Sequence, residues 1–170
     1  MSEVHIYTDG ACSGNPGKGG YGIVMEWVGG RNKHGKIIFK EFSEGFRKTT
    51  NNRMELLAII VALEQLKKEG MEVTVFSDSK YVVDAVNKGW VFGWEKKGFK
   101  DKKNPDLWRR FLKVYRRHKV KMEWVKGHND HLQNERCDKL AVNAAQKKKL
   151  LIDEGYEASI NSSKGEIDFG

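Results

Sequence analysis

Two aspartates stand where predicted strands end, and side chains at such positions often carry the chemistry of α/β proteins. Asp9 ends the alternating stretch HIYT, and Asp78 directly follows the β-rich run VTVFS. Ligands of open α/β sheets bind at the carboxyl ends of the strands. We therefore expect both carboxylates to reach the same end of the core.

Helical periodicity places two further carboxylates at that end. Glu55 opens the predicted helix MELLAIIVALEQL, and its own side of the helix carries apolar residues, namely Ala58, Ile59, Ala62 and Leu66. The Glu55 side chain is thus expected to point toward the sheet from the first turn. Asp138 precedes Ala141 and Ala145 at helical spacing, which places it at the edge of a buried helix face.

These four acids would repel one another if the fold brought them together. Two carboxylates about 4 Å apart repel by roughly 4 kcal/mol at an effective dielectric of about 20. A divalent cation offsets that repulsion, and ligation by oxygen alone favours Mg²⁺ or Mn²⁺. Taken singly, each acid has an alternative role: Asp9 as a turn cap, Asp78 as a helix N-cap, Glu55 as a partner of the helix dipole, Asp138 as a rim residue. Only the set of four predicts a metal site.

The loop after Asp9 is rich in glycine. Glycines occupy positions 10, 14, 17, 19 and 20, and such loops often bind phosphate through backbone N–H groups. A carboxylate is a poor neighbour for a phosphate unless a cation lies between them. The sequence therefore predicts that Asp9 faces a phosphate through a metal ion.

Positive charge is concentrated in one part of the chain. The formal net charge is +8, and residues 95–121, here called the basic segment, hold twelve basic and three acidic residues. A solvated helix face is one explanation, and a surface that binds a polyanion is the other. Nearby aromatic side chains suited to base or sugar contacts favour nucleic acid; they are Trp90, Phe92, Trp94 and Phe99.

The remaining pattern predicts the elements that hold these residues. Strands are expected over 4–8, 20–28, 36–44, 72–77 and 120–126. Helices are expected over 51–68 and 79–88, from the cap signal at residues 104–106, and over 134–148. The first three strands form an antiparallel meander, and helices alternate with strands afterwards. This order predicts an α/β fold with one mixed sheet flanked by helices.

Composition excludes several classes of protein. The longest apolar run, LLAIIVAL, is too short to cross a bilayer, and the first ten residues lack the features of a secretion signal. The two cysteines form no ligand motif. We expect a cytoplasmic protein without membrane contact, built as one domain over 1–150. Residues 151–170 are expected to form a flexible tail because their last part is polar and poorly patterned.

Four blocks of the sequence resemble the signature motifs of type I ribonuclease H. They are YTDGACSGNPG, TTNNRMEL, FSDSKYV and EWVKGHNDHLQNERCDKLA, and the resemblance covers about residues 4–146. It implies the ribonuclease H-like fold, a five-stranded mixed sheet, and metal-dependent endonucleolytic cleavage of the RNA strand of RNA/DNA hybrids. Residues 1–150 would be the catalytic domain. No hybrid-binding domain precedes Val4, so we expect the stand-alone catalytic form, acting as a monomer.

The resemblance also implies catalytic roles. Asp9, Glu55, Asp78 and Asp138 match the carboxylates that hold two Mg²⁺ ions with substrate bound, for which Mn²⁺ is a possible substitute. Activation of the attacking water and stabilisation of the departing 3′ oxygen would give 5′-phosphate and 3′-hydroxyl products. His128 in KGHNDH matches a mobile histidine that assists proton transfer or product release.

Substrate contacts are implied in the same way. Gly10, Asn15, Asn51 and Asn52 match positions that contact the minor groove of the hybrid, where 2′-hydroxyls are displayed. Thr50 and Asn104 resemble a pocket for a phosphate of the DNA strand. The channel along that strand corresponds to Tyr81, Trp90 and Trp94, although both tryptophans are also explained as ordinary core residues.

Residues 90–108 resemble the basic protrusion of the family, but the stretch is several residues shorter. Its candidate contacts are Lys96, Lys97, Lys102 and Lys103, and Glu95 stands where a lysine is usual. Two other functions are considered. A resolvase or DNA nuclease of the same architecture is disfavoured by the TTNNRME block. A non-catalytic hybrid-binding module would be expected to lack a carboxylate, and none is missing.

Overall fold

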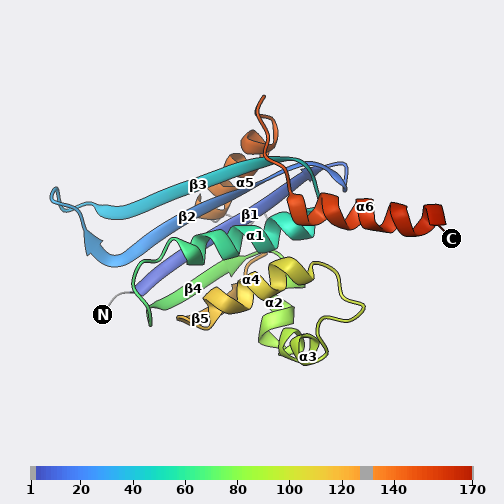
Figure 1. Cartoon of the computed structure of the whole chain (residues 1–170). Helices are drawn as coiled ribbons and strands as arrows, with labels where there is room; N and C mark the ends of the chain where they lie inside the picture. The colour runs from blue at the N-terminus through green and yellow to red at the C-terminus, as the bar shows by residue number, and fades with distance from the viewer. Residues whose placement is uncertain (1–2, 127–131, 170) are drawn as a thin grey trace.

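The computed structural model describes residues 3–126 and 132–169, with side chains up to residue 162. This part of the chain contains a five-stranded sheet with helices packed against it (Figure 1). The strands are β1 Glu3–Ser13, β2 Gly17–Arg31, β3 Ile37–Thr49, β4 Glu72–Ser77 and β5 Lys119–Trp124. The helices are α1 Asn51–Glu64, α2 Lys80–Asn87, α3 Trp90–Lys96, α4 Pro105–Tyr115, α5 Leu132–Ala145 and α6 Glu154–Phe169.

The sheet has the predicted mixed topology, with the strand order β3-β2-β1-β4-β5. The meander β1–β2–β3 is antiparallel, whereas β1 pairs with β4 and β4 pairs with β5 in parallel. Parallel neighbours require crossover connections, which α1 and the helices between β4 and β5 supply. The predicted ribonuclease H-like architecture is confirmed.

The core lies mainly between the sheet and helices α1 and α4. Leu56, Ile59 and Ile60 of α1 are fully buried, as are Trp108 and Phe111 of α4. Apolar residues occur all round α1 because α4 covers the side of α1 that faces away from the sheet. The amino-terminal turn of α1 is therefore held against β1 near the point where the pairing of β1 with β4 ends, although β1 itself continues to Ser13.

Two glycines let helices approach the sheet closely from opposite faces. A Cβ at Gly10 would lie 2.7 Å from the Glu55 backbone nitrogen in α1, so no other residue fits there without a shift. A Cβ at Gly22 would overlap the Cys137 carbonyl oxygen of α5. Gly22 is paired with Asp9, so α5 passes directly over the strand that carries this acid.

The chain beyond residue 150 differs from the expected tail, because residues 154–169 form the helix α6. Leu151 first makes a bridge to β3, donating to the Gly45 carbonyl and accepting from the Arg47 N–H, each at 2.9 Å. Asp153 then caps α6 by accepting from the Tyr156 N–H at 3.2 Å. A prediction based on apolar periodicity misses this helix because its anchors are polar. Figure 1 shows α6 running away from the sheet.

Another helix, α3, was not predicted because its seven residues are too few to show a helical period. The other helices agree with their predicted positions within a few residues. Among the described residues, no helix combines the length and apolar character needed to span a membrane.

Candidate active site

Three of the four predicted carboxylates meet at one point. One oxygen from each of Asp9, Glu55 and Asp78 lies within 4.8 Å of the others. We call these three residues the acidic cluster. They come from β1, from α1 and from the residue after β4, so the fold gathers them from three separate parts of the chain.

Strand register explains why the two aspartates are neighbours. Tyr7 of β1 pairs with Phe76 of β4 in parallel, and two further residues along each strand lead to Asp9 and Asp78. The alternative role of Asp78 as a helix cap is wrong, because Ser79 caps α2 by accepting from the Val82 N–H at 3.3 Å.

The backbone of Gly10 connects the acids of β1 and α1. Its N–H donates to Asp9 Oδ1 at 2.9 Å and to Glu55 Oε1 at 3.1 Å. The other Glu55 oxygen, Oε2, is buried and has no hydrogen-bond partner among the described residues. A buried carboxylate oxygen without a donor is costly, and an oxygen-seeking divalent cation is a fitting partner for it.

The electrostatics of the acidic cluster follow from burial and repulsion. Burial, with the nearby charges of Asp78 and Asp138, raises the pKa of Asp9 to about 7. Burial and the charges of Asp9 and Asp78 raise the pKa of Glu55 well above its usual range. The cluster therefore holds protons near neutral pH in the absence of a cation.

Asp138 lies close enough to the cluster to act on Asp9 electrostatically, and α5 holds it there, half-buried. Its neighbour Cys137 is fully buried, and burial together with the Asp9 charge raises the pKa of that thiol. His128 and His131 lie outside the described residues.

The predicted groove contacts lie beside α1 and are partly connected. Asn15, exposed in the loop between β1 and β2, accepts from the Asn51 N–H through Oδ1 at 3.0 Å. Asn52 is exposed on the same helical turn, and the Gly10 N–H donates to two carboxylates of the acidic cluster. The loop after β1 and the first turn of α1 are thus joined by a hydrogen bond between two of the predicted contact residues.

Comparisons with known proteins agree with this geometry. The family model for RNase H matches residues 1–146, which is most of the chain. The chain belongs to the ribonuclease H family. It is therefore a hydrolytic nuclease. A ribonuclease H of Desulforamulus reducens is 54% identical over 158 residues, covering 90% of this chain and 94% of that relative.

Solved structures of the ribonuclease H family share the fold. LC9-RNase H1, a type 1 RNase H with the type 2 active-site motif, is 34% identical with a TM-score of 0.77. The match covers 93% of this chain and 80% of that one. LC11-RNase H1, solved in complex with an RNA/DNA hybrid, is 28% identical with a TM-score of 0.60, over 84% of this chain and 96% of that one. The predicted resemblance is confirmed.

Two of the candidate DNA-strand residues, Asn104 and Tyr81, are joined by a hydrogen bond. Asn104 Nδ2 donates to the Tyr81 hydroxyl at 3.1 Å, and Trp108 Nε1 donates to the same oxygen at 2.9 Å. Thr50 caps α1 by accepting from the Arg53 N–H at 3.3 Å. Asn104 adopts a left-handed backbone conformation with φ of 62°, which asparagine tolerates.

The aromatic and basic candidates lie on and after α3. Trp90 is 48% exposed, so its explanation as a core residue is wrong, whereas Trp94 is half-buried and meets Trp108 edge to face. Lys102 Nζ lies 5.1 Å from the centre of the Trp94 ring. All four candidate lysines are exposed; they are Lys96, Lys97, Lys102 and Lys103.

Sequence reasoning missed two residues beside the site. Trp124, at the end of β5, donates through Nε1 to the Asp78 carbonyl at 3.2 Å, and Lys80 lies 4.7 Å from its ring centre. Arg53 is buried two residues before Glu55 and binds Asp106 and Asp153. The available signal for Arg53 was a basic residue in the first turn of a helix whose following residues are mostly apolar.

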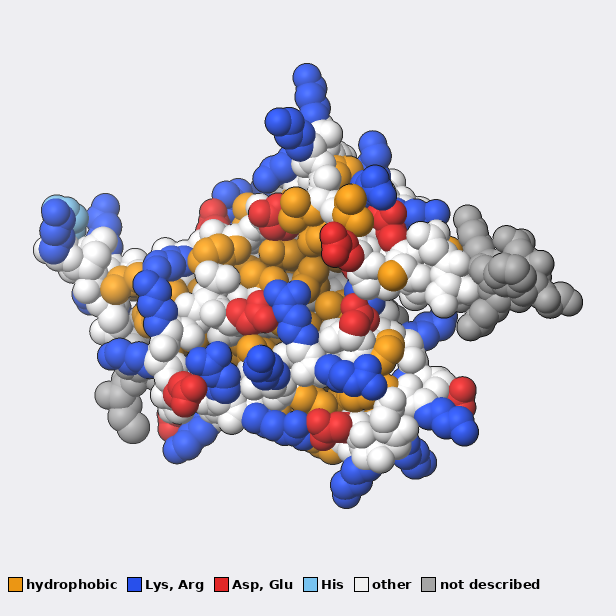
Figure 2. Space-filling model, viewed as in Figure 1, with side chains coloured by type: hydrophobic (Ala, Val, Ile, Leu, Met, Phe, Trp, Pro, Cys, Tyr) orange, Lys and Arg blue, Asp and Glu red, His pale blue; other side chains and the backbone are white. Residues whose placement is uncertain are grey.

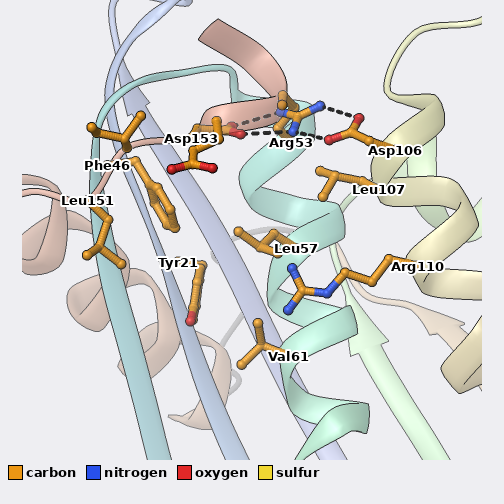
Figure 3. Close-up of a pocket in the computed structure, with 13 residues that line it drawn as sticks. Tyr21, Phe46, Arg53, Leu57, Val61, Asp106, Leu107, Arg110, Leu151 and Asp153 are labelled. Atoms are coloured by element: carbon orange, nitrogen blue, oxygen red, sulfur yellow. Dashed lines mark hydrogen bonds and ion pairs between the residues drawn. The ribbon is translucent and has the colours of Figure 1, made fainter. Parts of the chain in front are cut away.

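Arg53 lies at one end of a cleft between β3, α1, α4 and the bridging residues before α6. Figure 2 shows apolar side chains gathered at the centre of this face, with Lys and Arg around them. In Figure 3, Phe46, Leu57 and Val61 line the cleft, and the Arg53 guanidinium lies between Asp153 and Asp106. Burial alone would lower the pKa of Arg53, but the bonds to these two carboxylates raise it instead.

Proposed function

We propose that this nuclease cleaves the RNA strand of RNA/DNA hybrids endonucleolytically, using divalent cations held at the acidic cluster. The observation that carries the proposal is the meeting of Asp9, Glu55 and Asp78 within 4.8 Å in a chain of the ribonuclease H family. The hybrid bound by the neighbour LC11-RNase H1 supports the choice of substrate.

The residues present fit a metal centre. The acidic cluster and Asp138 would hold two Mg²⁺ ions with substrate bound, and Mn²⁺ is a possible substitute. When bound, such ions supply the positive charge that activates water and stabilises a departing 3′ oxygen, leaving 5′-phosphate and 3′-hydroxyl ends. The Gly10 N–H orients the Asp9 and Glu55 carboxylates, and Asp9 must release the proton that its raised pKa retains.

We assign recognition of the RNA strand to the polar residues beside α1. Phosphate contacts position a nucleic acid, whereas 2′-hydroxyl contacts distinguish RNA from DNA. Asn15, Asn51, Asn52 and the Gly10 backbone offer donors and acceptors next to the carboxylates. Several consecutive 2′-hydroxyls would therefore be read together.

We assign the deoxyribose strand to Thr50, Asn104, Tyr81, Trp90 and Trp94. The bond between Asn104 and Tyr81 joins the candidate phosphate pocket to the candidate channel. A strand of RNA, held in the A-form, would follow this path poorly. His128 is proposed to assist proton transfer or product release. Monomeric state and cytoplasmic location stay predictions.

The test is a panel of labelled duplexes with Mg²⁺ or with EDTA. We expect the RNA of the hybrid to be cut only with Mg²⁺, and duplex DNA and duplex RNA to be spared. Several ribonucleotides within duplex DNA should be cut well, and a single one poorly. Efficient cleavage of all-DNA duplex would favour the resolvase-like alternative, and binding without cleavage would favour the non-catalytic module.

A further inference from the structure

Arg53 uses all of its hydrogen-bond donors inside the protein. Its Nε donates to Asp153 Oδ2 at 2.8 Å, and Nη2 donates to Asp153 Oδ1 at 2.9 Å and to Asp106 Oδ2 at 2.7 Å. Nη1 donates to Asp106 Oδ1 at 2.9 Å and to Asn104 Oδ1 at 3.3 Å. A guanidinium has five N–H donors, so these contacts account for every one. Arg53 therefore does not bind a substrate phosphate itself.

The contact with Asn104 is the one that reaches the proposed substrate site. Asn104 accepts from Arg53 through Oδ1 and donates to the Tyr81 hydroxyl through Nδ2. These two bonds fix which way the amide points, because a flipped amide would turn its NH₂ group toward the guanidinium. The second Nδ2 hydrogen stays available to a phosphate oxygen.

Arg53 also fixes the other residue of the proposed phosphate pocket. Its backbone N–H donates to Thr50 Oγ1 at 3.3 Å, so the hydroxyl accepts from the helix and keeps its own hydrogen for an acceptor outside. The bond to Thr50 thus comes from the backbone of residue 53, whereas the bond to Asn104 comes from the Arg53 side chain.

Asp153 is the residue that holds Arg53 in this position from the carboxyl-terminal part of the chain. It is 7% exposed, accepts from Arg53 twice and accepts from Thr49 Oγ1 at 2.6 Å. It also caps α6. The residues before α6 are therefore bonded, through the Asp153 carboxylate, to the Arg53 guanidinium.

We infer that Asp153 is a positioning residue for hybrid binding, acting through the Arg53 side chain on Asn104, one of the two residues of the proposed phosphate pocket. The inference rests on the proposed function. The carboxyl-terminal segment, which lies outside the residues matched by the family model, thereby contributes to substrate affinity without touching substrate.

The first test compares Asp153→Asn with the wild type on an RNA/DNA hybrid, well below the melting temperature. Loss of one charged hydrogen bond behind the pocket should raise KM by roughly 3–10-fold and change kcat by less than about twofold. The matched control is Glu157→Gln on the same carboxyl-terminal segment. It breaks an exposed ion pair with Arg47 of β3 and should leave KM unchanged.

The second test separates positioning from a general loss of structure. Replacing single DNA-strand phosphates by neutral methylphosphonates should identify one phosphate whose replacement raises the KM of the wild type. In Asp153→Asn, the methylphosphonate at that phosphate should raise KM by a smaller factor than in the wild type. Any rise in KM caused by methylphosphonates at other phosphates should stay the same. An undiminished factor at that phosphate, or an equal rise of KM in Glu157→Gln, would overturn the inference.

Asp106→Asn keeps the inference testable if Asp153→Asn does not fold, because it alters the same guanidinium from α4. It should show the same rise of KM and the same smaller effect of that methylphosphonate, and an unchanged KM would count against the inference. A wild type that does not cleave hybrids would overturn the proposed function as well. Cleavage without any sensitive phosphate would overturn only the pocket and its positioning.

Discussion

Arg53 and Glu55 are two residues apart on α1, and both are almost fully buried. They differ in whether an oppositely charged side chain of the described residues lies beside them. Arg53 is compensated inside the protein by the carboxylates of Asp106 and Asp153. Glu55 lies against further acids, and among the described residues neither it nor Asp9 forms an ion pair with a basic side chain. The buried ion pairs of Arg53 hold parts of the fold together, whereas Glu55 and Asp9 are suited to the divalent cation of the proposed function.

The pKa directions express the same difference. Burial and neighbouring acids raise the pKa of Asp9 to about 7. Burial would also raise the pKa of Asp106, but the Arg53 guanidinium lowers it overall. A carboxylate whose partner is part of the fold is stabilised as an anion, whereas one that needs an external ion is held partly protonated until that ion arrives.

The largest expected effect is that of Asp9→Asn. We expect Mg²⁺-dependent cleavage to fall by roughly 10³-fold or more, because one oxygen ligand and its charge are lost. In EDTA the same variant should be more stable than the wild type by roughly 1–2 kcal/mol, since repulsion is relieved. Urea denaturation with and without EDTA measures the second effect.

The control for this variant is Glu72→Gln, an exposed acid at the other end of β4, which should change neither property. A variant at position 9 that remains active, or whose metal-free form is clearly less stable, would show that the acids do not form a functional cluster.

The opposite change in stability is expected when Arg53, whose charge is paired inside the protein, is replaced. Arg53→Met leaves Asp106 and Asp153 near each other without their cation and should lower the free energy of unfolding by roughly 3–5 kcal/mol. Arg110→Met, which breaks an exposed pair with Glu64, should cost only about 0–1 kcal/mol. An equal decrease in the free energy of unfolding in the two variants would mean that the buried ion pairs of Arg53 stabilise the fold no more than an exposed pair does.

Stability without metal should depend on pH with opposite slopes for the two regions. The Asp9 pKa of about 7 lies above the ordinary value of 3.8, so the folded state binds this proton more tightly. Its contribution is complete at low pH and is lost as pH rises from about 4 to 7. The lowered pKa of Asp106 gives a contribution present above its ordinary pKa and lost as pH falls below it.

Denaturation in EDTA at a series of pH values checks both signs. Asp9→Asn should flatten the slope between about pH 4 and 7, and Arg53→Met should weaken the loss at lower pH. A wild type whose stability rises steadily from pH 4 to 7 would contradict the raised pKa of the cluster.

The acidic cluster was predictable from the sequence because its members lie near the ends of predicted strands or on one face of a helix. Asp78 directly follows β4 and Glu55 follows the helical period, whereas Asp9 lies inside β1, two residues beyond the last pair of β1 with β4, and not at the strand end that was predicted. The partners of Arg53 could not be found this way. Asp106 and Asp153 reach it from α4 and from the turn before α6, across separations of 53 and 100 residues, and no local period encodes such a contact.

The same reasoning explains why the helix at the carboxyl end was not predicted. A tail prediction based on polarity misses a helix whose attachment consists of a cap by Asp153, a bridge at Leu151 and a surface pair between Arg47 and Glu157. The bridge and the surface pair both depend on β3 being present. Polar anchoring of this kind becomes visible only when the sheet has been assembled.

The smallest expected effect concerns a third kind of charge, the exposed lysines of the basic segment. Lys96, Lys97, Lys102 and Lys103 form no ion pair with any residue in the described part of the chain. Solvent screens these four ammonium groups, so each should contribute only weakly. If their partner is the hybrid backbone, their contribution must depend on salt.

Alanine at all four positions should weaken hybrid binding for every sequence tested and lower the log–log salt slope by about 0.9 per lost phosphate contact. Turnover at saturating substrate should stay the same, because the carboxylates are untouched. Alanine at Lys67, Lys68, Lys147 and Lys148 removes the same charge from other exposed positions and is the matched control. Equal changes of slope in the two variants would mean that net charge alone attracts the hybrid. A smaller slope only in the first variant would place the hybrid along α3 and the loop after it, next to Trp94 and Lys102, whose ring and ammonium already lie together.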